Sequence, residues 1–128
     1  MTTLASKLLL KAGRAAIVGA PSGYLELLGV LPAGVELVPP DSGGLDFLQV
    51  FVADLPALRA AIGTLRNVKP DGLLWVCYPK GGRRSGTDLN RDILWAELDS
   101  HGLTGVTLVA IDEIWSAMRF RPAGQLKR

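Results

Sequence analysis

The segment that most limits the fold lies in the middle of the chain. Two apolar runs suited to buried β-strands, residues 47–53 and 72–78, flank an amphipathic helical pattern at residues 55–65. Asp54 is placed to cap the amino end of this helix, and Pro56 falls in its first turn. Because both strands are apolar at nearly every position, both faces of their sheet should be covered. The segment therefore predicts a βαβ unit with a parallel sheet.

Shorter patterns on either side predict the remaining elements. We expect strands at residues 14–20, 35–38, 107–111 and 114–120, and helices at residues 24–28 and 88–101. Only Asp112 and Glu113 separate the last two strands, so those strands should be antiparallel. The predicted fold is a three-layer α/β fold, with a mostly parallel sheet of five to six strands that ends in a C-terminal antiparallel hairpin.

The connection between the second and third strands, residues 39–46, conflicts with a regular parallel sheet. It is shorter than a parallel crossover with its own helix usually requires. Either a helix has been lost there, or the second strand is antiparallel to its neighbours.

Length and composition limit the kind of protein. A chain of 128 residues, 48% hydrophobic and 20% charged, suits one packed domain over residues 1–128. The net charge of +2 gives no reason to expect nucleic-acid binding from bulk charge. Cys77 is the single cysteine, the amino-terminal apolar run is too short for a signal peptide, and no stretch approaches the length of a membrane span. We therefore predict a cytoplasmic protein without a membrane partner.

A basic loop at residues 80–87 follows the second buried strand and precedes a helix. Lys80, Arg83 and Arg84 supply positive charge, glycines allow backbone amides to approach a ligand, and Thr87 or Asp88 would cap the helix. Ligands of open α/β sheets bind at this edge, so the loop could accept a phosphate or a carboxylate. The alternative is a solvated surface loop. The order of residues does not match a P-loop.

The turn at residues 19–24 offers a second candidate site after the first strand. It lies where a nucleotide-binding fold places its glycine-rich loop, but it lacks the G-x-G-x-x-G order. Ser22 would otherwise serve as the cap of the following helix. Asp41 and Asp54 fall at predicted strand ends and could line the same crevice, although a turn and a helix cap explain them equally well.

The other reactive residue types carry weaker signals. Cys77 lies inside an apolar run and is expected to be buried and structural. His101 has no second ligand at metal spacing and is interpreted as a cation at a helix end, so we predict no metal site. Asp112 and Glu113 are adjacent acids at a turn, and Asp112 is kept as a candidate. The tryptophans are interpreted as core or core-edge residues: Trp75, Trp95 and Trp115.

Several segments together resemble a bacterial family of small single-domain α/β proteins catalogued as a domain of unknown function. They are residues 11–13, 19–24, 74–80, 87–92, 110–116 and 119–121. This resemblance covers most of the chain and implies a small single domain, but no activity. In the order of its elements the chain is also similar, more distantly, to class I methyltransferases, which implies a degenerate Rossmann or methyltransferase-like fold. The chain departs from them by lacking a G-x-G-x-G loop and one crossover helix.

The sequence favours a non-enzymatic binding or regulatory module whose ligand is a small phosphate-bearing molecule. We predict that no cofactor is bound. The sequence does not predict the oligomeric state. One alternative is a methyltransferase-like enzyme or nucleoside-cofactor binder that uses the turn at 19–24. Another is a nucleic-acid binder that uses the basic loop. The predicted ligand-binding residues are Lys80, Arg83, Arg84, Thr87 and Asp88, supported by Ser22 and Asp112.

Overall fold

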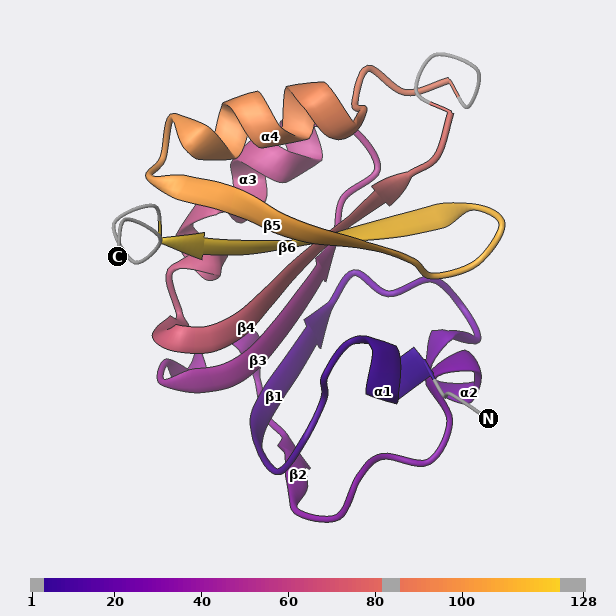
Figure 1. The fold of residues 1–128 in the computed structure, drawn as a ribbon, viewed down its shortest axis with the longest axis vertical. Helices are drawn as coiled ribbons and strands as arrows, with labels where there is room; N and C mark the ends of the chain where they lie inside the picture. The colour runs from indigo at the N-terminus through magenta and orange to yellow at the C-terminus, as the bar shows by residue number, and fades with distance from the viewer. Residues whose placement is uncertain (1–3, 82–85, 123–128) are drawn as a thin grey trace.

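A computed structural model describes residues 4–81 and 86–122, which form a mixed β-sheet with helices on both faces (Figure 1). The elements are α1 (Leu4–Lys7), β1 (Gly13–Val18), α2 (Tyr24–Leu28), β2 (Val35–Leu37), the 3-10 turn η1 (Pro40–Ser42), β3 (Leu45–Phe51), α3 (Leu55–Leu65), β4 (Val68–Pro79), α4 (Arg91–Asp99), β5 (Leu103–Ala110) and β6 (Trp115–Pro122). Each predicted element is present. Helix α1 was not predicted, and β4 and β5 begin earlier than the apolar runs that predicted them.

The six strands lie in the order β2-β1-β3-β4-β6-β5. Strands β1 to β4 are parallel to one another, whereas β6 is antiparallel to both β4 and β5. The predicted mostly parallel sheet with a C-terminal antiparallel hairpin is therefore confirmed. The hairpin loop is residues 111–114 and not a two-residue turn, because the backbone N–H groups of Ile111 and Asp112 both donate to the Trp115 carbonyl.

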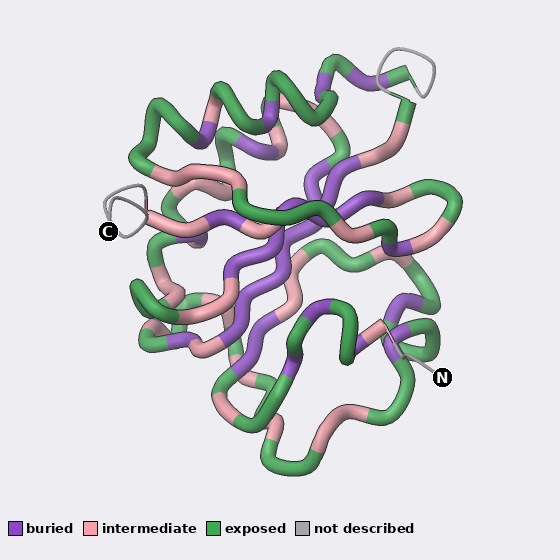
Figure 2. Tube along the Cα trace, in the orientation of Figure 1, coloured by how far each residue is buried: buried purple, intermediate pink, exposed green. Residues whose placement is uncertain are grey.

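The helices divide the core into two parts, one on each face of the sheet. Helices α3 and α4 pack on one face, and α1 and α2 pack on the other. The middle of the sheet is buried from both sides (Figure 2). Trp75, on β4, is 0% exposed, and its indole N–H donates to the Leu8 carbonyl at 3.0 Å, which fixes the end of α1 against the sheet. The three-layer arrangement follows from the strands that are apolar on both faces.

The structure resolves the conflict at the second strand. β2 pairs in parallel with β1, with Gly13 opposite Val35. No α-helix follows it; the connection contains only η1, which the Asn67 side chain holds by donating to the Pro40 carbonyl at 2.8 Å. The connection therefore lacks the crossover helix, and β2 still runs parallel to β1.

The two longer helices begin at side-chain caps. Asp54 accepts a hydrogen bond from the Ala57 N–H at 2.9 Å at the start of α3, as predicted. Helix α4 begins later than predicted, at Arg91, because its cap is Asn90, which accepts from the Ile93 N–H at 2.9 Å. The prediction that Thr87 or Asp88 caps this helix is wrong. In the part of the chain that is described, no helix has the length and apolar character needed to cross a membrane.

Candidate functional site at the carboxyl edge of the sheet

The carboxyl ends of the parallel strands meet at one edge of the sheet, where most of the residues singled out by the sequence lie. Strand β1 leads into the turn at 19–23, β3 leads to Asp54, and β4 leads to Lys80. The β5–β6 hairpin turn lies at the same edge, because the Lys80 ammonium group donates to the backbone carbonyl of Asp112. Ligands of open α/β sheets bind outside this edge.

The turn after β1 passes close to the end of β3. Gly19 has a φ of 71°, and a Cβ there would lie 2.9 Å from the Phe51 carbonyl oxygen. Only glycine fits this conformation and this spacing. Ser22 is exposed in the turn, but the residue that precedes α2 is Gly23 and no side chain caps the helix. The prediction that Ser22 caps α2 is wrong.

Aromatic rings pack beneath this edge. The rings of Tyr24 and Phe51 meet edge to face at a centroid distance of 4.8 Å, and Phe51 meets Trp115 in the same way at 5.2 Å. The three residues come from α2, β3 and β6. The cluster therefore joins the turn after β1 to the carboxy-terminal hairpin.

A chain of buried polar groups runs from this cluster into the sheet. The Tyr24 hydroxyl donates to Gln49 Oε1 at 2.9 Å, and Gln49 Nε2 donates to Cys77 Sγ at 3.2 Å. Burial raises the pKa of Tyr24 well above its usual range and raises the pKa of Cys77 to about 12, and the negative charge of Asp112 adds to both increases. Both groups are neutral at physiological pH, so Cys77 is a buried thiol, as expected. The only sequence signal for Gln49 was its place as a lone polar residue in an apolar strand.

Thr87, the last residue of the basic loop, and Asp88 after it make structural contacts. Thr87 is 9% exposed, and its hydroxyl donates to the Ala53 carbonyl at 2.6 Å and accepts from the Leu89 N–H at 3.1 Å. Asp88 Oδ1 accepts from the Leu55 N–H at 2.8 Å, at the first residue of α3. These contacts attach the chain before α4 to the junction of β3 and α3. Arg83 and Arg84 lie outside the described residues.

Asp112 shapes the hairpin turn. Its Oδ1 accepts from the N–H groups of Ile114 and Trp115, both at 2.8 Å, and Glu113 is exposed. An acidic side chain that bonds to the backbone two and three residues ahead is a common turn device. The two adjacent acids do not form a facing pair of carboxylates.

A cavity of about 450 Å³ lies beside Lys80 at the end of β4. Its walls include Tyr78 and Ser116 from the sheet and Asn90 and Arg91 from the start of α4. The structure thus brings Lys80 together with Arg91. It does not place Ser22, Thr87 or Asp88 in the wall of this cavity.

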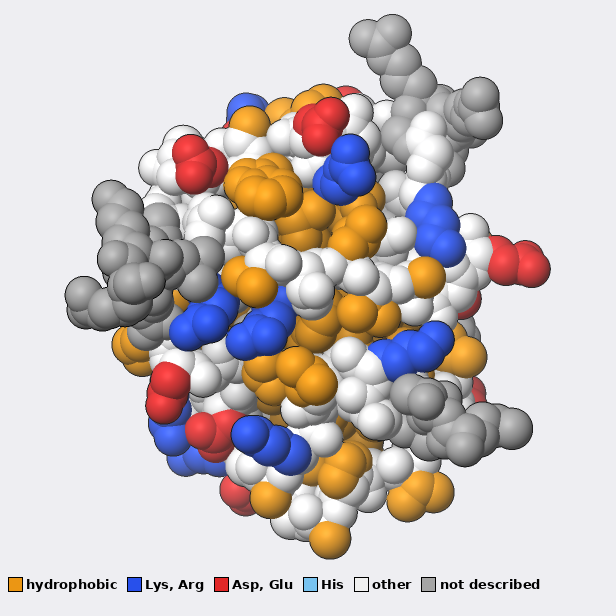
Figure 3. Space-filling model, in the orientation of Figure 1, with side chains coloured by type: hydrophobic (Ala, Val, Ile, Leu, Met, Phe, Trp, Pro, Cys, Tyr) orange, Lys and Arg blue, Asp and Glu red, His pale blue; other side chains and the backbone are white. Residues whose placement is uncertain are grey.

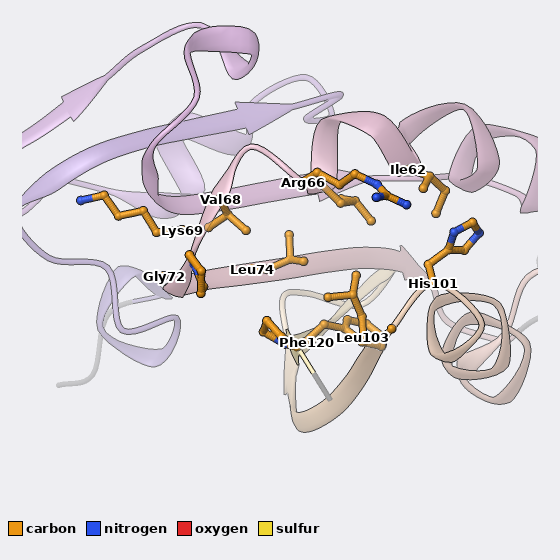
Figure 4. A pocket seen from close by; sticks show the side chains of 13 residues that line it. Ile62, Arg66, Val68, Lys69, Gly72, Leu74, His101, Leu103 and Phe120 are labelled. Carbon is orange, nitrogen blue, oxygen red and sulfur yellow. The ribbon is translucent and has the colours of Figure 1, made fainter. Parts of the chain in front are cut away.

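His101 lies away from this edge, directly after α4. Its Nε2 is 3.8 Å from Glu97 Oε2, one turn earlier on the chain. It borders a mostly apolar cavity of about 270 Å³ at the opposite edge of the sheet, with Arg66 and Phe120 (Figure 4). Among the described residues, no three His, Cys, Asp or Glu side chains are grouped as a metal site would require.

Comparison with known proteins identifies the fold and nothing finer. No protein-family model matches the chain, and no curated protein matches it, so the resemblance to a family of unknown function remains a prediction. Among solved structures, the ribosomal protein L11 methylase of Lactobacillus delbrueckii subsp. bulgaricus is 13% identical, with a TM-score of 0.54 over 91% of this chain and 73% of that chain.

Two further solved structures were determined with a bound nucleoside compound. A mutant of MtNAS in complex with S-adenosylmethionine is 18% identical, with a TM-score of 0.55 over 91% of this chain and 58% of that chain. The DhpI–SAH complex is 14% identical, with a TM-score of 0.55 over 93% of this chain and 80% of that chain. This chain thus spans little more than half of the MtNAS chain. The fold of the present protein is of the class I methyltransferase-like type.

Proposed function

We propose that the protein binds a nucleoside compound of the S-adenosylmethionine class at the carboxyl edge of the sheet, against the turn at residues 19–23. The support is the shared fold: the MtNAS and DhpI structures that match it hold S-adenosylmethionine and SAH. This favours the alternative drawn from the sequence over a module that binds only phosphate. The proposal concerns binding alone. Beneath the turn, Tyr24 and Cys77 are neutral and hydrogen-bonded to Gln49.

The observation that carries the proposal is the form of the turn. Gly19 and Gly23 both have positive φ, 71° and 82°, and both are exposed, so the turn presents main chain to solvent while Gly19 also packs against the Phe51 carbonyl. Such a turn lets a ligand approach the main chain closely. Ser22 adds an exposed hydroxyl between the two glycines. A nucleoside ligand would meet backbone amides and this hydroxyl, in place of the glycine pattern that the chain lacks.

Titration calorimetry and thermal unfolding of the full chain test the proposal. A ligand at a hundred times its Kd stabilises the folded state by about 2.7 kcal/mol, which raises the Tm of a domain of this size by roughly 10 °C. We expect this response to S-adenosylmethionine or SAH. Ser22→Trp, which places a large side chain on the exposed turn, should abolish it, whereas Ala60→Trp on the exposed side of α3 should not. No heat and no change in Tm with either compound at millimolar concentration would reject the proposal.

A second candidate function, anion binding, is favoured by the cavity beside Lys80. Lys80 and Arg91 both line it, and the ion pair of Arg91 within residues 4–81 and 86–122 is a long one, 3.6 Å from its Nε to Oδ1 of the exposed Asp92. An ion pair exposed in this way contributes little, so Arg91 remains available to an oxyanion.

Inorganic phosphate is the probe for this second function. We expect phosphate to raise the Tm of the native protein, and Arg91→Gln to remove the increase. Arg66→Gln, which changes the same type of residue at the opposite edge, is the matched control and should retain it. An equal response in the native protein and in Arg91→Gln would reject the cavity as the site.

A further inference from the structure

The largest cavity among those described here lies at the amino edge of the sheet, away from the candidate site. It has a volume of about 590 Å³. The end of α1 and the segment after it, residues 9–12, form one wall, and residues 46–47 of β3 and 71–73 of β4 form another. Arg119 enters from β6. The volume falls within the usual range of small-molecule pockets.

Arg119 lies on the sheet face that α1 covers. It pairs directly with Trp75 across β4 and β6, and paired residues of antiparallel strands project to the same face. Trp75 is fully buried beneath α1. The space-filling view of this face shows Lys and Arg side chains next to hydrophobic ones over the middle of the molecule (Figure 3).

The Arg119 guanidinium is buried in part without a counter-ion. Its Nε is shielded from solvent and has no hydrogen-bond partner, and within the described residues no carboxylate lies within 4.0 Å of the group. Burial lowers the pKa of Arg119, and the neighbouring Arg121 lowers it further. Arginine stays protonated in proteins, so its burial without a partner is costly. A shielded polar atom without a partner is uncommon and calls for an explanation, such as an ordered water, an ion or a ligand close to the group.

The acids on the cavity wall do not satisfy Arg119. Asp46 is occupied: its Oδ2 accepts from the Arg14 N–H at 2.9 Å, and its Oδ1 accepts from Lys69 Nζ at 2.9 Å. Asp71 also lines the cavity, and the positive charge of Lys69 interacts with it. An anion at the guanidinium would therefore share the cavity with one carboxylate, Asp46, that is already paired.

The same cavity has apolar walls. Leu9 is 50% exposed and has a φ of 62°, the one positive φ among the non-glycine residues described. A leucine pays a steric cost in this conformation, and such costs cluster at functional sites. Leu10, Phe47 and Leu73 add further apolar surface. The cavity therefore combines an unpaired guanidinium with surface that favours a hydrocarbon or aromatic group.

We propose that this cavity binds a small organic anion, with its oxyanion group on the Arg119 guanidinium and its apolar body against Leu9 and Leu73. Because Nε is shielded, the ligand would meet the two Nη groups, whose N–H donors form a planar fork that suits two oxygens of one carboxylate or phosphate. The site lies at the opposite edge of the sheet from the proposed nucleoside site, so either proposal can fail alone.

Arginine side-chain NMR of the full 128-residue chain tests this proposal. The Nε–Hε signal of Arg119 is assigned by its loss in Arg119→Lys, and the probes are hexanoate, hexanol and inorganic phosphate. Hexanoate should shift this signal with saturation and should bind at least tenfold more tightly than hexanol, which has the same apolar length without the charge. Phosphate, which lacks an apolar body, should bind more weakly than hexanoate.

Substitutions then locate the interaction. Arg119→Gln, monitored through the backbone amide signals of Leu9 and Leu73, should weaken hexanoate binding at least tenfold, whereas Arg59→Gln on α3 should leave it unchanged. Arg119→Lys, which keeps the charge but loses the fork, should fall between them. Equal binding of hexanoate and hexanol, no shift of the Arg119 signal, or unchanged affinity in Arg119→Gln would each overturn the proposal.

Discussion

At the scale of single residues, the described side chains that the sequence predicts to be ligand-binding take two different roles: some make structural contacts, and others lie exposed or beside a cavity. Thr87 and Asp88 hold the chain before α4 against the start of α3, and Asp112 closes the hairpin turn. Ser22 is exposed in a backbone turn and Lys80 borders a cavity. Short polar side chains next to glycines suit both turns and ligand sites, so their partners could not be predicted from the local sequence.

Asp88→Ala should destabilise the protein by about 1–2 kcal/mol, because it removes the acceptor for the Leu55 N–H at the amino end of α3. Asp88→Asn keeps an acceptor oxygen and should cost a few tenths of that amount. Urea unfolding measures both. If the alanine variant unfolds at the same urea concentration as the native protein, Asp88 has no such structural role.

Cys77 should make stability fall with rising pH. Its pKa is raised from 9.0 to about 12 in the folded protein, so between these values the unfolded chain loses a proton that the folded chain retains. The favourable contribution is complete below pH 9 and is lost as the pH rises towards 12, by up to about 1.4 kcal/mol per pH unit.

Cys77→Ala removes this contribution, and the free energy of unfolding should then fall less steeply above pH 9. The pKa of Tyr24 is also raised from 10.0 in the folded protein. Tyr24 therefore contributes to the fall in the free energy of unfolding above pH 10 in both the native protein and the variant. Urea unfolding at several pH values from 8 to 10.5 gives the two slopes, and comparing slopes cancels the fixed cost of the cavity. Identical slopes would show that Cys77 ionises equally in both states.

At the scale of elements, the long periodic segments and the short elements α2 and β2 were predicted, whereas helix α1 and the start of α4 were not. The buried strands β3 and β4 and the amphipathic helix α3 have patterns that only one type of element satisfies. Helix α1 has four residues, too few for a helical period to be recognised. The start of α4 was misplaced because Thr87, Asp88 and Asn90 are all good cap residues, and only contacts with Ala53 and Leu55 show which role each takes.

The turn after β1 should tolerate no side chain at Gly19. Gly19→Ala adds a Cβ 2.9 Å from the Phe51 carbonyl and places alanine at a positive φ, whereas Gly43→Ala meets a similar φ of 74° with nothing within 4 Å. The control should cost about 1 kcal/mol from backbone strain alone. Gly19→Ala should cost at least about 1 kcal/mol more, measured by urea unfolding. Equal costs would mean that β1 and β3 are not held this closely.

At the scale of the whole molecule, the chain keeps a methyltransferase-like sheet without one of its crossover helices. The eight residues, 39–46, of the predicted connection left two alternatives, a lost helix or an antiparallel second strand. The sequence could not decide between them, because a short edge strand has no pattern that distinguishes parallel from antiparallel pairing. The sequence also indicated the carboxyl edge as the site. The sequence did not indicate Arg119 as a ligand-binding residue. Whether its side chain has a partner depends on three segments that are far apart in the chain and meet only in the folded structure.

The two edges of the sheet therefore differ in what they offer a ligand. The carboxyl edge has a glycine-flanked turn above an aromatic cluster, and the amino edge has an unpaired guanidinium in a partly apolar cavity. Ligand binding at one edge should leave the other unoccupied.

Backbone amide chemical shifts, recorded while SAH is added to the full chain, test the central claim most directly. Binding at the carboxyl edge should shift the signals of residues 19–24 and of the hairpin turn at 111–114, with saturation, and should leave those of residues 9–12 and 71–73 in place. The absence of shifts at millimolar SAH, or shifts confined to the amino edge, would contradict a nucleoside site at the turn after β1.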